Sequence, residues 1–320
     1  MIRAGACLSL TGRFAPFGTQ AANGLRLWAD TAGAELAVLD DESEPAVLTE
    51  RLAGLAPEVD VLFGPYSTVL MRAAIPVAAA AGRLLFNHGG SGGNLSRPGE
   101  VVNVLTPARR YAEPFIAHLM QVCGGPLFTT TGRGAFGRDV TGGAAEAARA
   151  VGIRAEVLDA DRPPVGEWDL ISAGVYEDDM AAVRQARAMA NPPRYVCSVA
   201  AGVASFAGDA NDAEGVYGIG QWAPGAVRTV AAGMDEDAFL GAWNDRYGGA
   251  PDYPAVQAYA AGVIADAAGP GATWGTVAEL DVTTVFGRFR LDAASGEQIG
   301  HAPVLTRWQG GEAQVLDLGR

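Results

Sequence analysis

The sequence predicts an α/β protein of two lobes, each built on a doubly wound parallel sheet. Strand-like and helix-like segments alternate from the first residues, which is typical of βαβ units. The alternation restarts after Thr106-Pro107, so a second unit repeats the architecture of the first. A chain of 320 residues has room for both, because most domains contain about 100–200 residues.

Each element is predicted from apolar runs and periodicity, read in chain order. In the first unit we expect strands at 2–10, 35–39, 61–63, 83–87 and 101–105, and helices at 21–31, 46–55 and 69–81. In the second we expect strands at 126–131, 155–158, 170–173, 195–199 and 215–222, and helices at 112–122, 138–151 and 178–190. Two Ala-rich helices follow at 235–247 and 255–268. The tail segments 286–291, 304–308 and 313–316 predict a small antiparallel set.

The charge balance excludes several classes of partner and chemistry. Lys plus Arg number 23 against 36 Asp plus Glu, a net charge of −13, and no basic run is present, so nucleic acid is not expected as a partner. The chain has no lysine, which excludes Schiff-base chemistry and a P-loop ammonium. Charged residues interrupt every apolar run well before the roughly 18 residues that a membrane span needs, so no membrane insertion is expected.

The cysteines and histidines do not form a metal-binding pattern. Cys7, Cys123 and Cys197 are widely spaced, lie in or beside apolar stretches and are expected to be buried free thiols. The three histidines are dispersed, so we expect neither a metal nor another cofactor. Residues 2–10 are predicted to form a core strand and not a signal segment, so the chain is expected to be either a mature exported protein or cytosolic.

One motif favours an alternative function, a dinucleotide-dependent enzyme. Residues 132–137 read GxGxxG between a strand and a helix, and Asp159 and Asp161 follow at the appropriate distance. Against this interpretation, Asp139 stands where a phosphate would bind and Phe136 fills the close approach. The alternative depends on this motif alone, and no enzyme activity is expected.

Other candidate catalytic groups have structural interpretations. The serine-rich segment 91–96 lacks the Gly-x-Ser-x-Gly elbow of hydrolases, and His118 and His301 are expected to be structural. The acidic residues 177–179 begin a predicted helix and are interpreted as caps. Further acidic pairs occur at 40–41 and at 209 and 212.

The order of the segments, combined with several short motifs, resembles the type I periplasmic binding-protein fold. Within it, the resemblance is to the branched-chain amino-acid and amide receptors of ABC transporters. The motifs lie at residues 8–18, 23–25, 61–68, 74–81, 84–91, 136–137, 174–176, 213–216, 239–248, 257–259 and 287–290. The resemblance implies that residues 1–105 plus 224–284 form lobe 1 and residues 106–223 plus 285–320 form lobe 2. A hinge of several chain crossovers would join the lobes, and the ligand would bind between them.

The resemblance also assigns site residues. Thr68 and Ser91 match hydroxyl positions that, with the amides of Gly89 and Gly90, hold a ligand carboxylate or carbonyl, and Ser67 is an adjacent alternative. The positions that close over the ligand match Phe17, Phe136 and Tyr176, and Trp222 could add an aromatic wall. His88 follows a buried strand at the edge where open α/β sheets bind ligands. It could therefore contact the ligand or simply pack the loop.

The residue that would bind a ligand ammonium is missing from its usual place. Amino-acid receptors of this family commonly carry an acid just after the strand matched by 195–199, where this chain has none. A buried ammonium without a counter-charge is unfavourable. We therefore expect an amide or a small or aromatic carboxylate, with an amino acid retained if Glu177 or Asp178 substitutes.

The implied function is an extracytoplasmic receptor that delivers its ligand to the membrane permease of an ABC importer, without breaking a bond. The alternative on the same fold is a cytosolic, amide-responsive sensor read by a partner protein.

Overall fold

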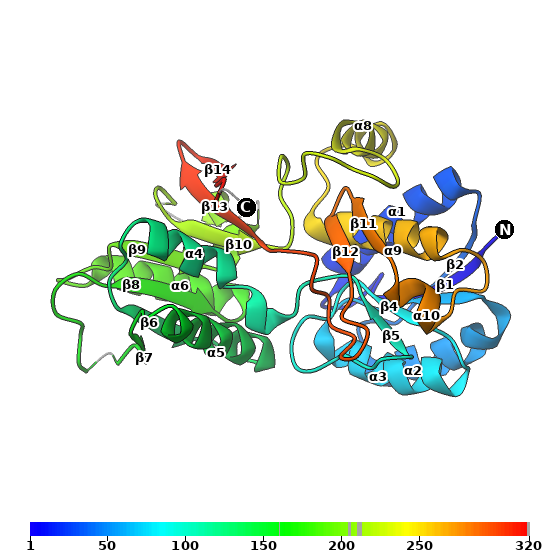
Figure 1. The fold of residues 1–320 in the computed structure, drawn as a ribbon, viewed down its shortest axis with the longest axis horizontal. Coiled ribbons are helices and arrows are strands. Elements are labelled where there is room, and N and C mark those ends of the chain that lie inside the picture. Colours follow the sequence, from blue (N-terminus) through cyan, green and yellow to red (C-terminus); the bar gives the residue numbers. More distant parts are fainter. Residues whose placement is uncertain (160, 204–205, 210–212, 319–320) are drawn as a thin grey trace. The chain divides into compact units, whose positions relative to one another are not determined.

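The computed structural model describes residues 1–159, 161–203, 206–209 and 213–318, and these form two compact units. Unit 1 contains Met1–Thr106 and Pro224–His301, and unit 2 contains Pro107–Ala223 and Ala302–Arg320. The chain therefore passes between the units three times. Figure 1 shows a sheet covered by helices in each unit, which confirms the predicted fold class.

Unit 1 is built on a parallel five-stranded sheet in the order β2-β1-β3-β4-β5. Its strands are β1 (Arg3–Leu8), β2 (Glu35–Asp40), β3 (Val61–Phe63), β4 (Leu85–Asn87) and β5 (Val101–Asn103). Its helices are α1 (Ala15–Ala32), α2 (Pro45–Leu55), α3 (Thr68–Ala80), α8 (Glu236–Tyr247), α9 (Tyr253–Ala268) and α10 (Trp274–Ala278), with a 3₁₀ turn at Ala56–Glu58. The strands β3, β4 and β5 are completely buried, as expected for a sheet covered on both faces.

Unit 2 is built on a seven-stranded sheet in the order β14-β13-β10-β9-β8-β6-β7. The parallel strands are β6 (Leu127–Thr131), β7 (Ala155–Val157), β8 (Asp169–Ala173), β9 (Tyr195–Ser198) and β10 (Tyr217–Gly220). The antiparallel strands β13 (Val304–Gln309) and β14 (Glu312–Val315) extend the sheet beyond β10. The helices are α4 (Glu113–Gln121), α5 (Ala135–Ala150), α6 (Tyr176–Ala188) and α7 (Phe206–Asp209), with 3₁₀ turns at Ala108–Arg110 and Ala200–Gly202.

The tail differs from the prediction of one antiparallel set. Strand β12 (Gly287–Arg290) pairs with β11 (Asp281–Thr284), a strand that the sequence analysis missed, whereas β13 and β14 join the sheet of unit 2. Residues 285–301 accordingly belong to unit 1, not to lobe 2 as expected. Hydrogen bonds hold them there: Gln298 Nε2 donates to the Val104 carbonyl at 3.1 Å, and Thr106 Oγ1 donates to the His301 carbonyl at 3.0 Å.

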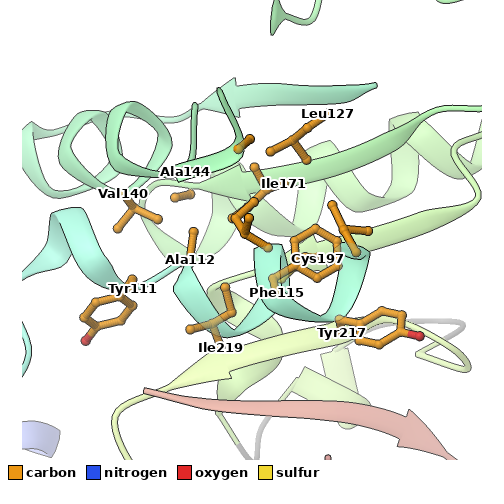
Figure 2. Packing of buried hydrophobic residues seen from close by; sticks show 14 of the residues in the cluster. Tyr111, Ala112, Phe115, Leu127, Val140, Ala144, Ile171, Cys197, Tyr217 and Ile219 are labelled. Atoms are coloured by element: carbon orange, nitrogen blue, oxygen red, sulfur yellow. The ribbon is translucent and has the colours of Figure 1, made fainter. Parts of the chain in front are cut away.

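One of the two hydrophobic cores formed by the described residues of unit 2 lies between its sheet and the helices α4 and α5. Figure 2 shows Phe115, Ile171 and Tyr217 packed within it, and all three side chains are buried. Cys197 belongs to this core and Cys7 is buried in unit 1, as predicted for free thiols. Cys123 is exposed, contrary to the prediction, and lies in a turn just after α4 with a positive φ of 52°.

Helix α1 begins six residues earlier than the predicted residue 21 and packs closely on α9. Pro16 occupies the first turn, where a missing N–H has no cost, so the helix starts at Ala15 and includes Phe17. Glycines allow the close approach to α9. A Cβ at Gly24 would lie 2.1 Å from the Ala255 carbonyl oxygen, and one at Gly262 would lie 2.2 Å from the Trp28 ring.

Within the described residues, no helix is both long and apolar enough to cross a membrane.

The adjacent glycines 142 and 143 of α5 provide a test of close backbone packing. A Cβ at Gly143 would lie 1.8 Å from the Arg109 carbonyl oxygen, whereas a Cβ at Gly142 would meet nothing within 4 Å. We expect Gly143→Ala to destabilise the protein by about 1–3 kcal/mol through overpacking. Gly142→Ala should be neutral or stabilise it by up to about 1 kcal/mol, because alanine favours the helix. Chemical denaturation monitored by circular dichroism measures both, and equal effects would contradict the packing described here.

Candidate functional site

The strand order of unit 1 identifies where a ligand would bind. Strands β2 and β3 lie on opposite sides of β1. The chain leaves β1 toward β2 and leaves β3 in the opposite direction, so the loops after β1 and β3 diverge at the carboxyl edge of the sheet. Open α/β sheets bind ligands at such a switch point. The loop after β4 ends at the same edge, because all five strands are parallel. These three loops carry or adjoin Phe17, Ser67, Thr68 and the segment 88–91.

An aromatic group stands at this edge. The Phe17 and Tyr66 rings stack with centroids 4.5 Å apart and planes 8° from parallel. The Tyr66 and Tyr253 hydroxyls form a hydrogen bond of 2.5 Å, which links the β3 loop to the first turn of α9. Of these three residues the sequence analysis identified only Phe17. Tyr66 lies within the motif at residues 61–68, but nothing in the sequence indicated that Tyr253 would lie beside it.

Ser67 and Thr68 begin α3 at the switch point. Ser67 has a φ of 92° and a ψ of 147°, a backbone conformation that residues other than glycine rarely adopt. Such backbone strain tends to occur at functional sites. Its hydroxyl accepts a hydrogen bond from the Leu70 N–H at 3.3 Å, so it caps the helix. Thr68 Oγ1 accepts from the Gly92 N–H at 3.0 Å, which joins the β3 and β4 loops. An accepting hydroxyl keeps its own proton to donate.

The loop after β4 is shaped by Asn87, which the sequence analysis did not single out. Asn87 Oδ1 accepts from the N–H groups of Gly89 and Gly90, at 3.3 and 2.9 Å. Its Nδ2 donates to the Gly90 carbonyl at 2.8 Å and to Asn103 Oδ1 at 2.9 Å. The two glycine amides expected to hold a ligand are therefore already used within the loop.

Ser91, the next residue, has hydrogen-bond donors that are not used within the loop. No hydrogen bond of the Ser91 N–H or hydroxyl occurs within the described part of the chain, and Ser91 is half-buried. Gly89 is required for the loop to approach β3, because a Cβ there would lie 2.7 Å from the Pro65 carbonyl oxygen. Gly89 and Gly90 thus shape the loop, and Ser91 is the member with donors to offer.

His88 is completely buried at the end of β4. Neither ring nitrogen makes a hydrogen bond of normal geometry with the described residues, although the Gly64 backbone lies near the ring. Burial lowers the pKa of His88 from 6.5 to about 4, so the imidazole is neutral at pH 7.

The corresponding edge of unit 2 lies where the strand order reverses between β6 and β8. Here the GxGxxG segment, residues 132–137, is occupied by the side chain of Asp178 from the first turn of α6. Asp178 accepts from the Arg133 N–H at 2.7 Å and pairs with the Arg133 guanidinium at 2.8 Å. A pyrophosphate at this loop would meet that carboxylate, which opposes the dinucleotide interpretation.

The three unit 2 residues assigned to the ligand lie on or near this edge. Phe136 is in the first turn of α5 and packs edge-on against Tyr111, with ring centroids 5.3 Å apart. Tyr176 begins α6 and packs against the cluster around Trp168 and Met180. Trp222 follows β10 by two residues and is buried.

Among the acidic residues 177–179 the buried one is Asp179, whereas the sequence suggested Glu177 or Asp178 as the partner of a ligand ammonium. Glu177 is exposed and Asp178 is paired with Arg133. Asp179 is 1% exposed and accepts from Ser172 Oγ at 2.7 Å and from the Ala200 N–H at 3.0 Å. None of the three is the N-cap, which is Val175. Burial raises the pKa of Asp179, and both of its oxygens tie α6 to the ends of β8 and β9.

The described residues hold no group of three or more His, Cys, Asp or Glu side chains arranged for a metal ion. Asp212, of the acidic pair at 209 and 212, lies outside the described residues.

The buried His88 predicts a pH dependence of stability. Its folded pKa of about 4 lies below the ordinary value of 6.5, so the unfolded state binds more protons between these values. The contribution of neutral His88 to the free energy of unfolding is therefore fully present above pH 6.5. It is lost as the pH falls toward 4, and the total loss is about 3 kcal/mol. Urea denaturation at stepped pH should show this loss in the wild type and not in His88→Asn. Parallel profiles of the two proteins would contradict a buried neutral imidazole.

Comparison with known proteins agrees with this architecture. The family model described as periplasmic binding protein matches residues 1–301. A search of curated protein sequences found no match. The branched-chain amino-acid transporter substrate-binding protein LivJ from Streptococcus pneumoniae, solved with isoleucine, has a TM-score of 0.75 and 18% identity over 99% of both chains.

Two further structures have similar scores. An ABC transporter substrate-binding protein from Desulfitobacterium hafniense, solved with Leu, has a TM-score of 0.78 and 17% identity over 98% of this chain and 99% of that chain. An ABC transporter solute-binding protein from R. palustris, solved with benzoate, has a TM-score of 0.73 and 16% identity over 98% and 95%. The solved structures share the fold, and the family model covers most of the chain, as the motifs predicted. The chain therefore belongs to the periplasmic binding protein family.

Proposed function

We propose that the protein is an extracytoplasmic receptor of an ABC importer that binds a small polar ligand at the carboxyl edge of the unit 1 sheet. The observation that carries the proposal is the junction of the β3 and β4 loops. The Gly92 N–H donates to Thr68 Oγ1 at 3.0 Å, which places the Thr68 hydroxyl beside the residue that follows Ser91. Both side chains are half-buried, so a ligand can reach them.

The chemistry of this edge suits a carbonyl or carboxylate oxygen. Thr68 offers a hydroxyl proton, and Ser91 offers a hydroxyl and an N–H. The stacked rings of Phe17 and Tyr66, 4.5 Å apart, supply an apolar surface beside these donors. A few convergent polar groups beside an aromatic wall are typical of small-molecule sites.

The ligand class follows from the acids. Asp178 is neutralised by Arg133, and both Asp179 oxygens already accept hydrogen bonds. Neither is free to balance an α-ammonium, which leaves only the exposed Glu177 among these acids. We therefore favour an amide or a small or aromatic carboxylate over a free amino acid. The roles of Phe136, Tyr176 and Trp222 at the ligand remain part of this proposal, as does delivery to a membrane permease. The structures solved with isoleucine, Leu and benzoate give this fold ligands of comparable size.

A thermal-shift panel of amino acids, short amides, urea and aromatic carboxylates tests the proposed function. A ligand at 100 times its Kd should stabilise the folded protein by about 2.7 kcal/mol. Shifts confined to amides or ammonium-free acids are expected. A response only to free amino acids would contradict the ligand class, and no response to any member would contradict the receptor assignment.

The hydroxyl positions are tested by substitution. We expect Thr68→Val and Ser91→Ala each to raise the Kd of a carboxylate ligand by about 10–100-fold, because a hydrogen bond to a charged group contributes about 1.5–3 kcal/mol. Thr68→Ser keeps the hydroxyl and should bind like the wild type. Thr49→Val, on the exposed side of α2, removes a hydroxyl that bonds to the Pro45 carbonyl and is not assigned to the ligand, so it serves as the matched control. Isothermal titration calorimetry measures all four, and wild-type affinity in Thr68→Val and Ser91→Ala would overturn this assignment.

A further inference from the structure

Unit 1 contains a cavity of about 330 Å³ that the proposed function does not use. Helices α1 and α9 and the residues 232–234, which precede α8, line this cavity. All three segments belong to unit 1, so the cavity is complete within that unit. Its volume lies within the range of small-molecule sites, which is about 300–1,000 Å³.

The cavity lies toward the amino edge of the sheet. Helix α1 ends at Ala32, shortly before Glu35, whose N–H donates to the Ile2 carbonyl beside the start of β1. The close contacts at Gly24 and Gly262 show that α9 lies beside α1 and runs in the same direction (Figure 1). Both helices therefore run away from the carboxyl edge, where the proposed ligand loops are, and the cavity lies where they end.

The segment that precedes α8 is held in place on both sides. The N–H groups of Ala231 and Ala232 donate to the Thr283 carbonyl of β11, at 2.7 and 3.1 Å. The Met234 N–H donates to the Tyr259 hydroxyl of α9 at 2.9 Å. This wall of the cavity is thus positioned by the protein's own hydrogen bonds, which lowers the ordering cost of binding a ligand.

The lining combines apolar surface with one negative charge. Trp28, Tyr259 and Val263 are buried and contribute aromatic and aliphatic carbon. Of the described residues that line the cavity, only Asp266 is charged. Asp266 is exposed, and its carboxylate makes no ion pair within the described part of the chain. A ligand that matches this lining has a hydrocarbon body and a cationic group.

The ends of the two helices add to the negative charge. A helix C-terminus carries about half a negative charge on carbonyl groups that lack helical partners. The structure describes α1 and α9 completely, and neither carries a basic side chain in its last turn. Together with Asp266 and the net charge of −13, these ends favour a cation in the cavity and disfavour an anion.

We propose that this cavity is a second binding site, which takes a small organic cation: a primary ammonium or guanidinium group on a short aliphatic or aromatic chain. The cationic group faces Asp266 and the two helix ends, and the chain packs on Trp28 and Val263. The site goes beyond the proposed function and does not depend on it, because it involves none of the ligand loops at the carboxyl edge.

Calorimetric titration of the full chain with phenethylammonium and 2-phenylethanol tests the site, because the two probes are similar in size and differ in charge. We expect the wild type to bind the cation at least about fivefold more tightly than the alcohol, and high salt to reduce the difference. Asp266→Asn should lose most of this preference. Asp245→Asn removes an exposed acid of α8 outside the cavity and should keep it.

Blocking variants locate the bound cation. Ala267→Trp, on the cavity wall, should raise the Kd of phenethylammonium at least about tenfold, whereas Ala53→Trp, on the exposed side of α2, is the matched control. If Ala267→Trp does not fold, Ala32→Trp fills the same cavity from α1. Thr68→Val alters the proposed ligand loops and should leave the affinity for the cation unchanged.

Several results would overturn the second site. These are equal affinity for the two probes, no detectable binding of phenethylammonium, and unchanged binding in the folded blocking variant. Loss of cation binding in Thr68→Val would place the probe at the carboxyl edge and would also overturn the site. The thermal-shift panel tests the receptor proposal with other ligands, so the two proposals can fail separately.

Discussion

Chain direction in a parallel sheet is the constraint on which the candidate site depends. Because β1, β3 and β4 run the same way, the loops that follow them must all end at one edge, although Phe17 and Ser91 are far apart in sequence. The reversal of strand order between β1 and β3 then parts the helices that follow and leaves room at that edge. The β4 loop at this edge is rich in glycine, with four glycines among residues 88–94.

Close backbone contacts fix the geometry around this edge. Gly24 lets α1 touch α9, and Gly89 lets the β4 loop touch the β3 loop, because a Cβ at either position would overlap a carbonyl oxygen. Asn87 then holds the β4 loop by mimicking a strand partner for Gly89 and Gly90. The loop that carries Ser91 is thus positioned by backbone contacts before any ligand arrives, which lowers the ordering cost of binding.

Much of this architecture could be predicted from the sequence, because alternation of buried strands and periodic helices is a local property. The carboxyl-edge loops followed directly from it, whereas Thr68 and Ser91 became candidates only through the resemblance to the binding-protein family. The contacts that complete the site could not be predicted. The Tyr66–Tyr253 hydrogen bond joins residues 187 positions apart, and β11 has too few apolar residues to resemble a strand. The burial of Asp179 in place of Asp178 depends on which face of α6 meets the sheet, a rotation that three consecutive acids do not reveal.

The three cysteines differ sharply in accessibility, and this has a practical consequence. Burial raises the pKa of Cys7 to about 12 and that of Cys197 well above its ordinary value, so neither forms a thiolate at neutral pH. Cys123 is exposed at the end of α4, in unit 2. A maleimide dye would therefore attach to a single position of the natural sequence, and unit 2 carries a ready attachment point for a fluorescent reporter without any engineered substitution.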